Sequence, residues 1–581
     1  MDYHRVMNQV LSRLPFLIEL FFNGTYLLLS SLKNTERVPD FIGVEEVSRV
    51  LDTMVWFAPL VIFFVVLVNF MNCRNGEEFF RRYLFSIVVF FPMVITWGDH
   101  QFSYLLSAAH LLSSVLSLYD SEQKPIKTER NLNRNILNRI KLKPAQLVLI
   151  SFIVIILIGT FLLMLPVSSV EGVSISFVDA LFMATSATCV TGLSTLSLNT
   201  DFTGLGQVII LILIQIGGLG YMTLFSSMSL LLGRSMGMKD RVVMQDLLDV
   251  SSLEELFATI VDIIKYTFFI ELWGGIVLTI AFTFEGYDFG VATYYGFFHS
   301  ISAFCNAGFS LFDNSLEGYA TSPLINGTIC ILILLGGVGF IVLRQMREVV
   351  IGQRSVKRLS LHSRIVIIST ITLTLASALI IFFGEFLGAL DSYGLWDKVQ
   401  VSVFQAITLR TAGFNTIPLN GLHTYTIYAM CIFMFIGASP GSTGGGIKTT
   451  TLAILLNSIK STLKGEKSVT IFDRTIPPPL VVKATALTFI SMIISSFFLL
   501  FMMKMEPNQN FLTLFFEVIS AGGTVGLSLG ITPFLSVPGK ILISAMMLIG
   551  RIGPLTLVLA IGERKSKSGK FGYPDGRMMI G

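Results

Sequence analysis

Residues 300–310 read SISAFCNAGFS, and three other stretches of the chain align with them on a single glycine. The four stretches are ATSATCVTGLS (184–194), SISAFCNAGFS (300–310), QAITLRTAGFN (405–415) and VISAGGTVGLS (518–528). Their aligned glycines, Gly192, Gly308, Gly413 and Gly526, lie 116, 105 and 113 residues apart. Each glycine is followed by Leu or Phe and then by Ser or Asn. Four copies at nearly equal spacing indicate a fourfold internal repeat.

The composition is that of a membrane protein. Of the 581 residues 53% are hydrophobic and only 13% are charged, whereas soluble domains average about 25% charged residues. The mean hydropathy is +0.74. A spanning helix needs roughly 20 apolar residues, and such stretches lie near 51–71, 145–165, 205–232, 260–284, 324–343, 365–385, 425–457, 480–503 and 537–562. The five cysteines show no zinc or disulfide spacing, and nothing in the net charge of +4 predicts nucleic-acid binding.

Positive charge predicts the orientation of these spans. Lysines and arginines gather in 127–143, 234–241, 344–364, 460–474 and the tail, and the intervening connections from residue 166 onward contain none. Because positive charge stays on the cytoplasmic side, we expect a multi-pass protein of the plasma membrane with both termini in the cytoplasm. The predicted parts are N-terminal membrane helices with about four spans (1–125), a basic cytoplasmic linker (126–144) and four repeats (145–233, 234–343, 344–460 and 461–581, the last with a cytoplasmic tail).

Each repeat reads as a span, a short half-helix, a glycine loop and a second span. Bare backbone in hydrocarbon costs several kcal/mol per unsatisfied group, so such a loop is tolerated only where it lines a wet cavity. Four loops around an axis can aim carbonyl oxygens at a dehydrated ion, and the negative C-terminal ends of the half-helices favour a cation. Ordinary loops with glycine used for close packing are the alternative, but they do not explain four copies.

The expected fold is therefore an all-α polytopic membrane protein with four tandem helix–re-entrant pore helix and loop–helix repeats around a pseudo-fourfold pore, plus an N-terminal helical membrane domain. The predicted selectivity filter consists of Val190, Thr191, Gly192, Asn306, Ala307, Gly308, Thr411, Ala412, Gly413, Thr524, Val525 and Gly526.

A second glycine-rich stretch, GASPGSTGGGIKTTT (437–451), lies in the middle of the long apolar segment 425–457. Its glycines, serines and proline cannot hold a regular helix, so we expect the helix to break inside the membrane, just below the filter. Arg551 lies at a similar depth in the last span and needs acceptors, which the carbonyls of 437–446 or the hydroxyls of Ser439, Ser442 and Thr443 would supply. The predicted gate consists of Gly441, Gly444, Gly445, Gly446, Lys448 and Arg551.

Several charged side chains fall within apolar stretches, where each is costly unless paired. Arg410 precedes the third filter loop, Glu517 lies nine residues before Gly526, and Glu271 lies in the span 260–284. The acids could attract cations, or a carboxylate could pair with Arg410 and brace the filter from behind; the second interpretation is favoured for Arg410 and Glu517. His299 is expected to be a hydrogen-bonded packing residue. Lys448 either adds charge near the pore or reaches toward the inner interface.

At these residues the sequence resembles the KtrB/TrkH/HKT superfamily of potassium transporters, with the Ktr-type membrane subunit the nearest type. The resemblance spans roughly 140–575 and rests on TCVTGLS, CNAGFS, LRTAGFNT, GTVGLS, LSLHSR (359–364), GASPGSTGGGIKTTT and GRIGPLT (550–556). It implies K⁺ uptake, a homodimer in the lipid bilayer, Na⁺ as a candidate co-ion in symport, and a cytosolic ring of RCK-type nucleotide-binding subunits. It implies no cofactor in this chain, and glycine at all four filter positions implies K⁺ rather than Na⁺.

Three other functions were weighed. A membrane ATPase using 437–451 as a phosphate loop is disfavoured because Ile447 separates Gly446 from Lys448 and no strand precedes the loop. We therefore expect no enzyme. A carrier with inverted repeats is disfavoured because all four repeats run in the same direction. A sodium-selective or non-selective cation pore remains the alternative.

Overall fold

The computed structural model describes residues 144–231, 253–350 and 358–553, with residues 22–27, 50–51, 54–55, 61–62, 107, 352 and 355 in addition. The described part is almost entirely helical, and one antiparallel pair of two-residue strands joins α16 to α17. The expected N-terminal spans, the basic linker, the basic segment 234–241 and the C-terminal tail lie almost entirely outside the described residues.

The helices follow one another in four groups, each with a long helix, a short helix, a loop and a further helix. The first group is α5 (Pro144–Leu163), α6 (Phe177–Cys189) and α7 (Gly204–Leu231); the second is α9 (Leu253–Phe284), α10 (Phe289–Phe304), α11 (Pro323–Gly337) and α12 (Phe340–Val350). The third is α13 (Leu361–Glu385), α14 (Leu395–Thr408), α15 (Thr424–Phe435) and α16 (Thr449–Leu463); the fourth is α17 (Pro478–Met505), α18 (Phe511–Gly523) and α19 (Val537–Ile552).

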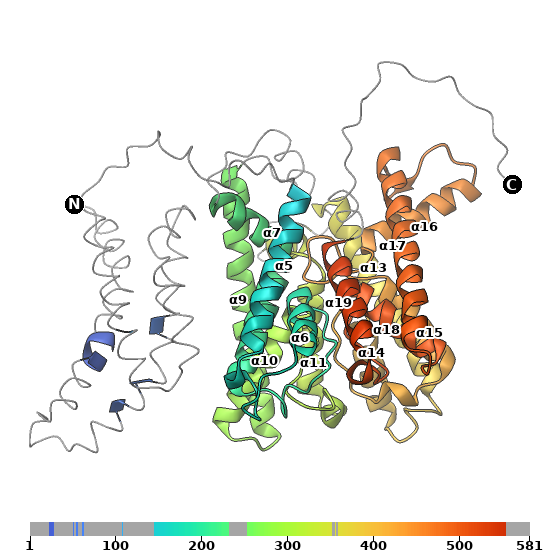
Figure 1. The fold of residues 1–581 in the computed structure, drawn as a ribbon. Coiled ribbons are helices and arrows are strands. Elements are labelled where there is room, and N and C mark those ends of the chain that lie inside the picture. Colours follow the sequence, from blue (N-terminus) through green and yellow to red (C-terminus); the bar gives the residue numbers. More distant parts are fainter. Residues whose placement is uncertain are drawn as a thin grey trace, which may run out of the picture.

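Short elements connect the helices of these groups. The strands are β1 (Thr470–Ile471) and β2 (Arg474–Thr475). Four single 3₁₀ turns lie in the outer connections: η3 (Pro166–Ser168), η4 (Glu317–Tyr319), η6 (Leu419–Gly421) and η7 (Thr532–Phe534). The four short helices α6, α10, α14 and α18 all lie in the lower half of the bundle in Figure 1.

The distribution of buried and exposed side chains is that of a protein surrounded by an apolar medium. The short helices form the interior, where Phe182, Phe304, Phe404 and Phe516 are almost completely buried. The long first helix of each group instead exposes large apolar side chains, for example Phe161 on α5, and only 11% of the most apolar window of α17 is buried. Exposed apolar belts of this kind are stable only in contact with lipid or a further protein surface.

The observed helices are less regular than the membrane spans that the sequence predicts. In the described part of the chain three helical segments are long and apolar enough to cross a membrane, Asp262–Phe284, Leu361–Glu385 and Pro478–Met505. A fourth is added if α11 and α12 count as one span, but they meet at an angle of 112°. The stretch 324–343, predicted as one continuous span, is therefore broken, because Gly339 adopts a φ of +91° that ends the helix.

The last group of helices packs against the first, so that the bundle closes on itself. Lys540, in the first turn of α19, donates to Asp179 in the first turn of α6 at 2.7 Å. Both helices begin at a serine, since Ser536 accepts from the backbone N–H of Gly539 and Ser176 from that of Asp179. These caps satisfy amides that the first helical turn leaves free, and they fix where the two helices meet.

Candidate ion pathway and gate

The four aligned glycine motifs adopt the same backbone conformation. In each, a positive φ occurs at the residue that opens the predicted filter and again at its glycine. The values are +56° and +96° at Val190 and Gly192, +59° and +71° at Asn306 and Gly308, +72° and +81° at Thr411 and Gly413, and +51° and +91° at Thr524 and Gly526. Positive φ is uncommon for residues other than glycine, so its occurrence at four non-glycine residues, each two positions before a glycine that also has positive φ, indicates one repeated loop design.

The four loops meet in a closed ring. A methyl group placed on Gly192 would lie 2.5 Å from the carbonyl oxygen of Ala307, and one on Gly308 would lie 2.7 Å from that of Ala412. A methyl group on Gly413 would lie 2.6 Å from the carbonyl oxygen of Val525, and one on Gly526 would collide with that of Thr191. Each glycine thus faces the middle carbonyl of the next loop, in the order first, second, third, fourth and back to the first.

Ring closure explains why glycine stands at all four positions. Any side chain there would enter the space of a neighbouring loop's backbone, and a positive φ would strain it as well. The twelve predicted filter residues are therefore brought together at one place, from segments separated by more than 300 residues of sequence.

Serines in the short helices hold two of the loops. The hydroxyl of Ser186 accepts from the N–H of Gly192, and that of Ser520 accepts from the N–H of Gly526, both at 3.1 Å. In the second loop Ser302 instead donates to the carbonyl of Phe309 at 2.7 Å. The third loop has Ile407 at this position. Three of the four motifs carry serine six residues before the glycine, but the spacing alone does not show which backbone group a hydroxyl will meet.

Glu517 and His299 occupy equivalent places, nine residues before the filter glycine. Glu517 accepts hydrogen bonds from Ser528 at 2.9 Å and from Thr532, both in the segment that leaves the fourth loop. His299 contacts the carbonyl of Tyr295 through Nδ1 at 2.7 Å and the hydroxyl of Ser310 through Nε2 at 3.1 Å. His299 is thus a hydrogen-bonded packing residue, stacked on Phe312 with ring centroids 5.0 Å apart.

The favoured pairing of Arg410 with a carboxylate is not formed in the structure. Among the ion pairs of the described residues none joins Arg410 to Glu517, whose carboxylate is satisfied by the two hydroxyls instead. Within the same part of the chain, Nε and Nη2 of Arg410 have no hydrogen-bond partner. Glu271 lies behind the second loop, where it accepts from Gln215 at 3.1 Å. Arg410 and Glu271 are both buried next to filter loops rather than exposed to a pathway.

The segment predicted as a broken helix consists of α15, a loop over 436–448, and α16. The loop doubles back on itself, since the N–H of Gly437 donates to the carbonyl of Ile447 at 2.9 Å. It is also tied to the break between α11 and α12: Ser439 donates to Gly337 at 3.1 Å, and Phe340 donates to Gly441 at 3.0 Å. The glycine run therefore forms a defined, packed loop, in which Gly441 and Gly446 have φ values of +69° and +68°.

This loop contacts residues of the predicted filter directly. The N–H of Gly445 donates to the hydroxyl of Thr524, the first residue of the fourth filter loop, at 3.0 Å. Gly444 lies so close to Thr411, the first residue of the third loop, that a methyl group would collide with its hydroxyl. The gate loop, defined as residues 437–446, is therefore packed against the filter without an intervening side chain.

Arg551 joins the gate loop to the opposite side of the bundle. Its guanidinium donates to the carbonyl of Thr443 in the gate loop and to the carbonyl of Gly217 in α7. The acceptors are thus carbonyls, one of them in the predicted loop. The hydroxyls proposed as alternatives are engaged elsewhere, because Ser442 donates to the carbonyl of Ser439 and Thr443 to that of Phe304.

Lys448 folds back onto the loop that it follows. Its ammonium group donates to the carbonyl of Gly444 at 2.7 Å and to that of Gly445 at 3.3 Å. Lys448 and Arg551 therefore bind neighbouring carbonyls of one loop, at Gly444, Gly445 and Thr443. Of the two roles considered for Lys448, this geometry supports charge near the predicted pathway.

In three groups the helix after the predicted filter loop is broken, and in the fourth α19 ends, at a comparable number of residues from the filter glycine. Sequence reasoning predicted such a break for the third group alone. Positive φ occurs at Gly220 inside α7, at Gly339 after α11, at Gly441 in the gate loop and at Gly553, which caps α19. These glycines follow their filter glycines by 28, 31, 28 and 27 residues. The clusters GGLG (217–220) and GGVG (336–339) are shorter than the glycine run of 437–446 and gave a weaker signal.

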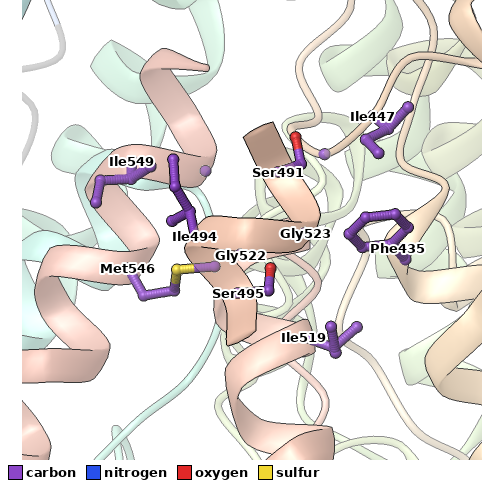
Figure 2. A pocket seen from close by; sticks show the side chains of 12 residues that line it. Phe435, Ile447, Ser491, Ile494, Ser495, Ile519, Gly522, Gly523, Met546 and Ile549 are labelled. Atoms are coloured by element: carbon purple, nitrogen blue, oxygen red, sulfur yellow. The ribbon is translucent and has the colours of Figure 1, made fainter. Parts of the chain in front are cut away.

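A small cavity lies behind the gate loop. Gly446 and Ile447 of the loop region, Gly522 and Gly523 of α18, and residues of α17 and α19 line a space of about 30 Å³, which is about the volume of one water molecule. Figure 2 shows Phe435, Ile447 and Ile519 on one side and Ile494, Met546 and Ile549 on the other. The loop therefore borders a small, mostly apolar cavity.

Comparison with known proteins places the chain in a family. Residues 134–568 match the family model of TrkH, described as a cation transport protein. This match spans most of the chain. The chain belongs to the TrkH family. It is a membrane protein and a cation transporter of the Ktr/Trk type, and its named relatives are transporters rather than enzymes.

Individual relatives of the TrkH family agree with this assignment. The chain is 38% identical over 444 residues to the Ktr system potassium uptake protein B of Bacillus subtilis, covering 76% of this chain and 98% of that protein. It is 34% identical over 449 residues to the potassium/sodium uptake protein NtpJ of Enterococcus hirae, covering 76% and 98%. The crystal structure of the potassium transporter TrkH from Vibrio parahaemolyticus has the same fold, with a TM-score of 0.58 at 18% identity, covering 88% of this chain and 97% of that one.

Proposed function

We propose that this chain takes up K⁺ across the plasma membrane through the ring formed by the four glycine loops. The observation that carries the proposal is the closed contact order of Gly192, Gly308, Gly413 and Gly526, each facing the middle carbonyl of the next loop. Backbone carbonyls arranged around an axis can replace the hydration shell of a monovalent cation. The four short helices end at these loops, so the negative ends of their dipoles favour a cation there.

Potassium is the proposed ion for two reasons. Relatives of the chain are named as potassium uptake proteins, among them the Ktr system protein B of Vibrio alginolyticus at 34% identity. All four ring positions are glycine, so no side-chain hydroxyl interrupts the carbonyl ring. The proposed filter comprises Val190–Gly192, Asn306–Gly308, Thr411–Gly413 and Thr524–Gly526. Glu517 would support it from behind through its hydrogen bonds to Ser528 and Thr532, and Arg410 through its buried position beside the third loop.

The proposed gate is the loop 437–446 together with Lys448 and Arg551. The contact of Gly445 with Thr524, the first residue of the fourth proposed filter loop, supports a place for the gate loop at the inner end of the filter. Arg551 bonds the loop to α7, and charge-assisted hydrogen bonds are roughly twice as strong as neutral ones. We assign this arrangement to a closed pathway, in which release of Arg551 lets the loop move toward the cavity lined by Ile447.

The oligomeric assembly and the membrane topology are also proposals. The chain would act as a homodimer in the lipid bilayer with both termini in the cytoplasm, and a cytosolic ring of RCK-type nucleotide-binding subunits would control the gate. Names such as "Ktr system" describe relatives that work as parts of systems. Na⁺ is a candidate co-ion, and the first 125 residues would add membrane helices to the four-repeat core.

A sodium-conducting or non-selective cation pathway is the second candidate, because the relative NtpJ is named for both potassium and sodium. Expression in a cell that lacks potassium uptake distinguishes the two. We expect growth on low K⁺ to be restored and uptake to be competed by Rb⁺ far better than by Na⁺. Rescue with equal competition by Na⁺ would support the second candidate, and failure of an expressed, membrane-inserted protein to rescue growth would contradict both.

A further inference from the structure

The outer side of the ring is held differently in neighbouring quarters. In the fourth group the carboxylate of Glu517 accepts from Ser528, two residues beyond the filter glycine, and from Thr532. In the second group His299 lies at the equivalent position, and its Nε2 faces Ser310, also two residues beyond the filter glycine. In both quarters a buried acceptor on the short helix holds the segment that leaves the filter loop.

In the first and third groups the residue at the equivalent position of the short helix cannot form this connection. The positions equivalent to Glu517 are Met183 in the first group and Phe404 in the third, and both are buried. Neither side chain can accept a hydrogen bond from the segment that leaves its loop as a carboxylate or imidazole does. The third group uses a different connection, in which Asn415 donates to Glu317 of the second group at 2.7 Å.

The ring order puts the two held quarters opposite each other. Gly308 of the second loop contacts Gly413, Gly413 contacts Gly526, and Gly526 contacts Gly192. The second and fourth loops therefore face each other across the ring. Two opposite attachments, each from a short helix to the segment that leaves its own loop, fix the spacing of the ring along one diagonal. On the other diagonal neither short helix has an acceptor at this position, and the third loop is tied to the second group through Asn415 instead.

The tautomer of His299 leaves Nε2 free to accept a hydrogen bond from Ser310. The N–H of Leu311 points at Nε2 at 3.4 Å, so Nε2 accepts and the proton lies on Nδ1, facing the carbonyl of Tyr295. Both held quarters thus present an acceptor to the serine of the outgoing segment. In the fourth quarter the network continues, because Ser528 also accepts from the N–H of Gly530 at 3.0 Å.

We propose that Glu517 and His299 are positioning residues that fix the outer end of the filter along one diagonal and so set its preference for K⁺ over Na⁺. This inference rests on the proposed filter. A smaller ion is discriminated only if the carbonyls cannot close in on it, and attachments from behind the loops restrict that movement. Neither side chain touches the ion; both act through Ser528 and Ser310.

The test compares Glu517→Met with Glu517→Gln in liposomes that contain the purified protein. Methionine is the residue that the first group carries at this position, and it keeps the volume without an acceptor. Glutamine keeps an acceptor of nearly the same shape. We expect Glu517→Met to lower the Rb⁺-to-Na⁺ uptake ratio about tenfold, the factor that a lost hydrogen bond of the stronger, charge-assisted kind produces. We expect Glu517→Gln to restore most of the ratio.

Two further variants remove only a hydroxyl group, so that a change in ion selectivity can be separated from a loss of folding. Ser528→Ala removes the donor alone and should lower the same ratio, with no further loss when combined with Glu517→Met. Ser194→Ala is the matched control, since its quarter has Met183 in place of an acceptor, and it should leave the ratio unchanged. Thermal unfolding of each purified variant separates lost selectivity from lost fold.

The outcomes separate this inference from the proposed function. An unchanged ion ratio in Glu517→Met and Ser528→Ala, while Gly308→Ser abolishes the preference, would overturn the role of Glu517 and leave the filter standing. Equal loss in Glu517→Met and Glu517→Gln would also overturn it, because the shared acceptor would then be irrelevant. An unchanged ratio in Gly308→Ser would overturn the filter itself.

Discussion

Replacing Arg551 by methionine tests how strongly the gate loop is held. The guanidinium donates to the carbonyls of Thr443 and Gly217, and these are its two hydrogen bonds across the pathway. Hydrogen bonds to charged groups contribute about 1.5–3 kcal/mol each, and removing the guanidinium from water offsets part of the sum. A net stabilisation of the closed loop by about 3 kcal/mol corresponds to a roughly 150-fold shift in the closed-to-open equilibrium.

The assay is rubidium uptake into liposomes that contain the purified protein and no cytosolic subunit. We expect the wild-type protein to be nearly silent and Arg551→Met to raise uptake by at least about tenfold, with saturation once the loop is open most of the time. Arg551→Lys should give an intermediate rate, because an ammonium group lacks the fork that reaches two carbonyls at once.

Arg344→Met is the matched control. Arg344 is an exposed arginine whose partner, Glu348, lies one turn further along α12, and we expect its replacement to leave uptake unchanged. Wild-type uptake by Arg551→Met, in protein that unfolds at the wild-type temperature, would refute the reasoning. Equal increases in Arg551→Met and Arg344→Met would also refute it, because the effect would then follow lost positive charge rather than lost contacts.

Two other predictions concern the backbone of the gate and of the filter. Gly445→Ala puts a methyl group against the hydroxyl of Thr524, so we expect the gate loop to be displaced and rubidium uptake without a cytosolic subunit to rise. The control is Gly421→Ala, where a methyl group meets nothing within 4 Å and uptake should stay unchanged. Similar rates in the two variants would contradict the contact between Gly445 and Thr524. Ser520→Ala removes the acceptor for the N–H of Gly526, which costs about 1 kcal/mol. We expect the preference for K⁺ over Na⁺ in competition assays to fall about fivefold. An unchanged preference would show that this hydroxyl does not position the loop.

The filter loops could be predicted from sequence because their design depends on backbone conformation. A residue that must adopt positive φ next to a neighbour's carbonyl has to be glycine, so Gly192, Gly308, Gly413 and Gly526 are visible in the sequence itself. The break at 437–446 was predictable for the same reason, since a run of glycines has no good alternative in a membrane span.

Side-chain partners could not be predicted in the same way. Arg410 and Glu517 have opposite charges and both lie near filter loops, but charge says nothing about the direction in which each side chain leaves its helix. Glu517 is satisfied by the hydroxyls of Ser528 and Thr532, two common residues in a connection without any distinguishing pattern. The helix breaks at Gly220 and Gly339 were not predicted, because the clusters GGLG (217–220) and GGVG (336–339) are shorter than the glycine run of 437–446 and small residues in membrane helices also serve close helix packing.

The depth of Arg551 was predictable from helix rise, whereas its partners were predictable only in part. Counting residues along the last span put Arg551 level with the gate loop, and a carbonyl of that loop is indeed one of its acceptors. The second acceptor, the carbonyl of Gly217, comes from α7 of a different group. It became visible only with the helices in place, because the approach of α7 to α19 depends on the closure of the bundle.

The most direct test of the central claim is the ion preference of Gly308→Ser, measured as rubidium uptake in competition with K⁺ and with Na⁺ in liposomes that contain the purified protein. A serine Cβ at this position would lie 2.7 Å from the carbonyl oxygen of Ala412, and the φ of +71° strains it further. If the four glycine loops form the filter, the wild-type protein prefers K⁺ and the variant loses most of that preference while remaining folded. A folded variant with the wild-type preference would contradict the assignment of the filter.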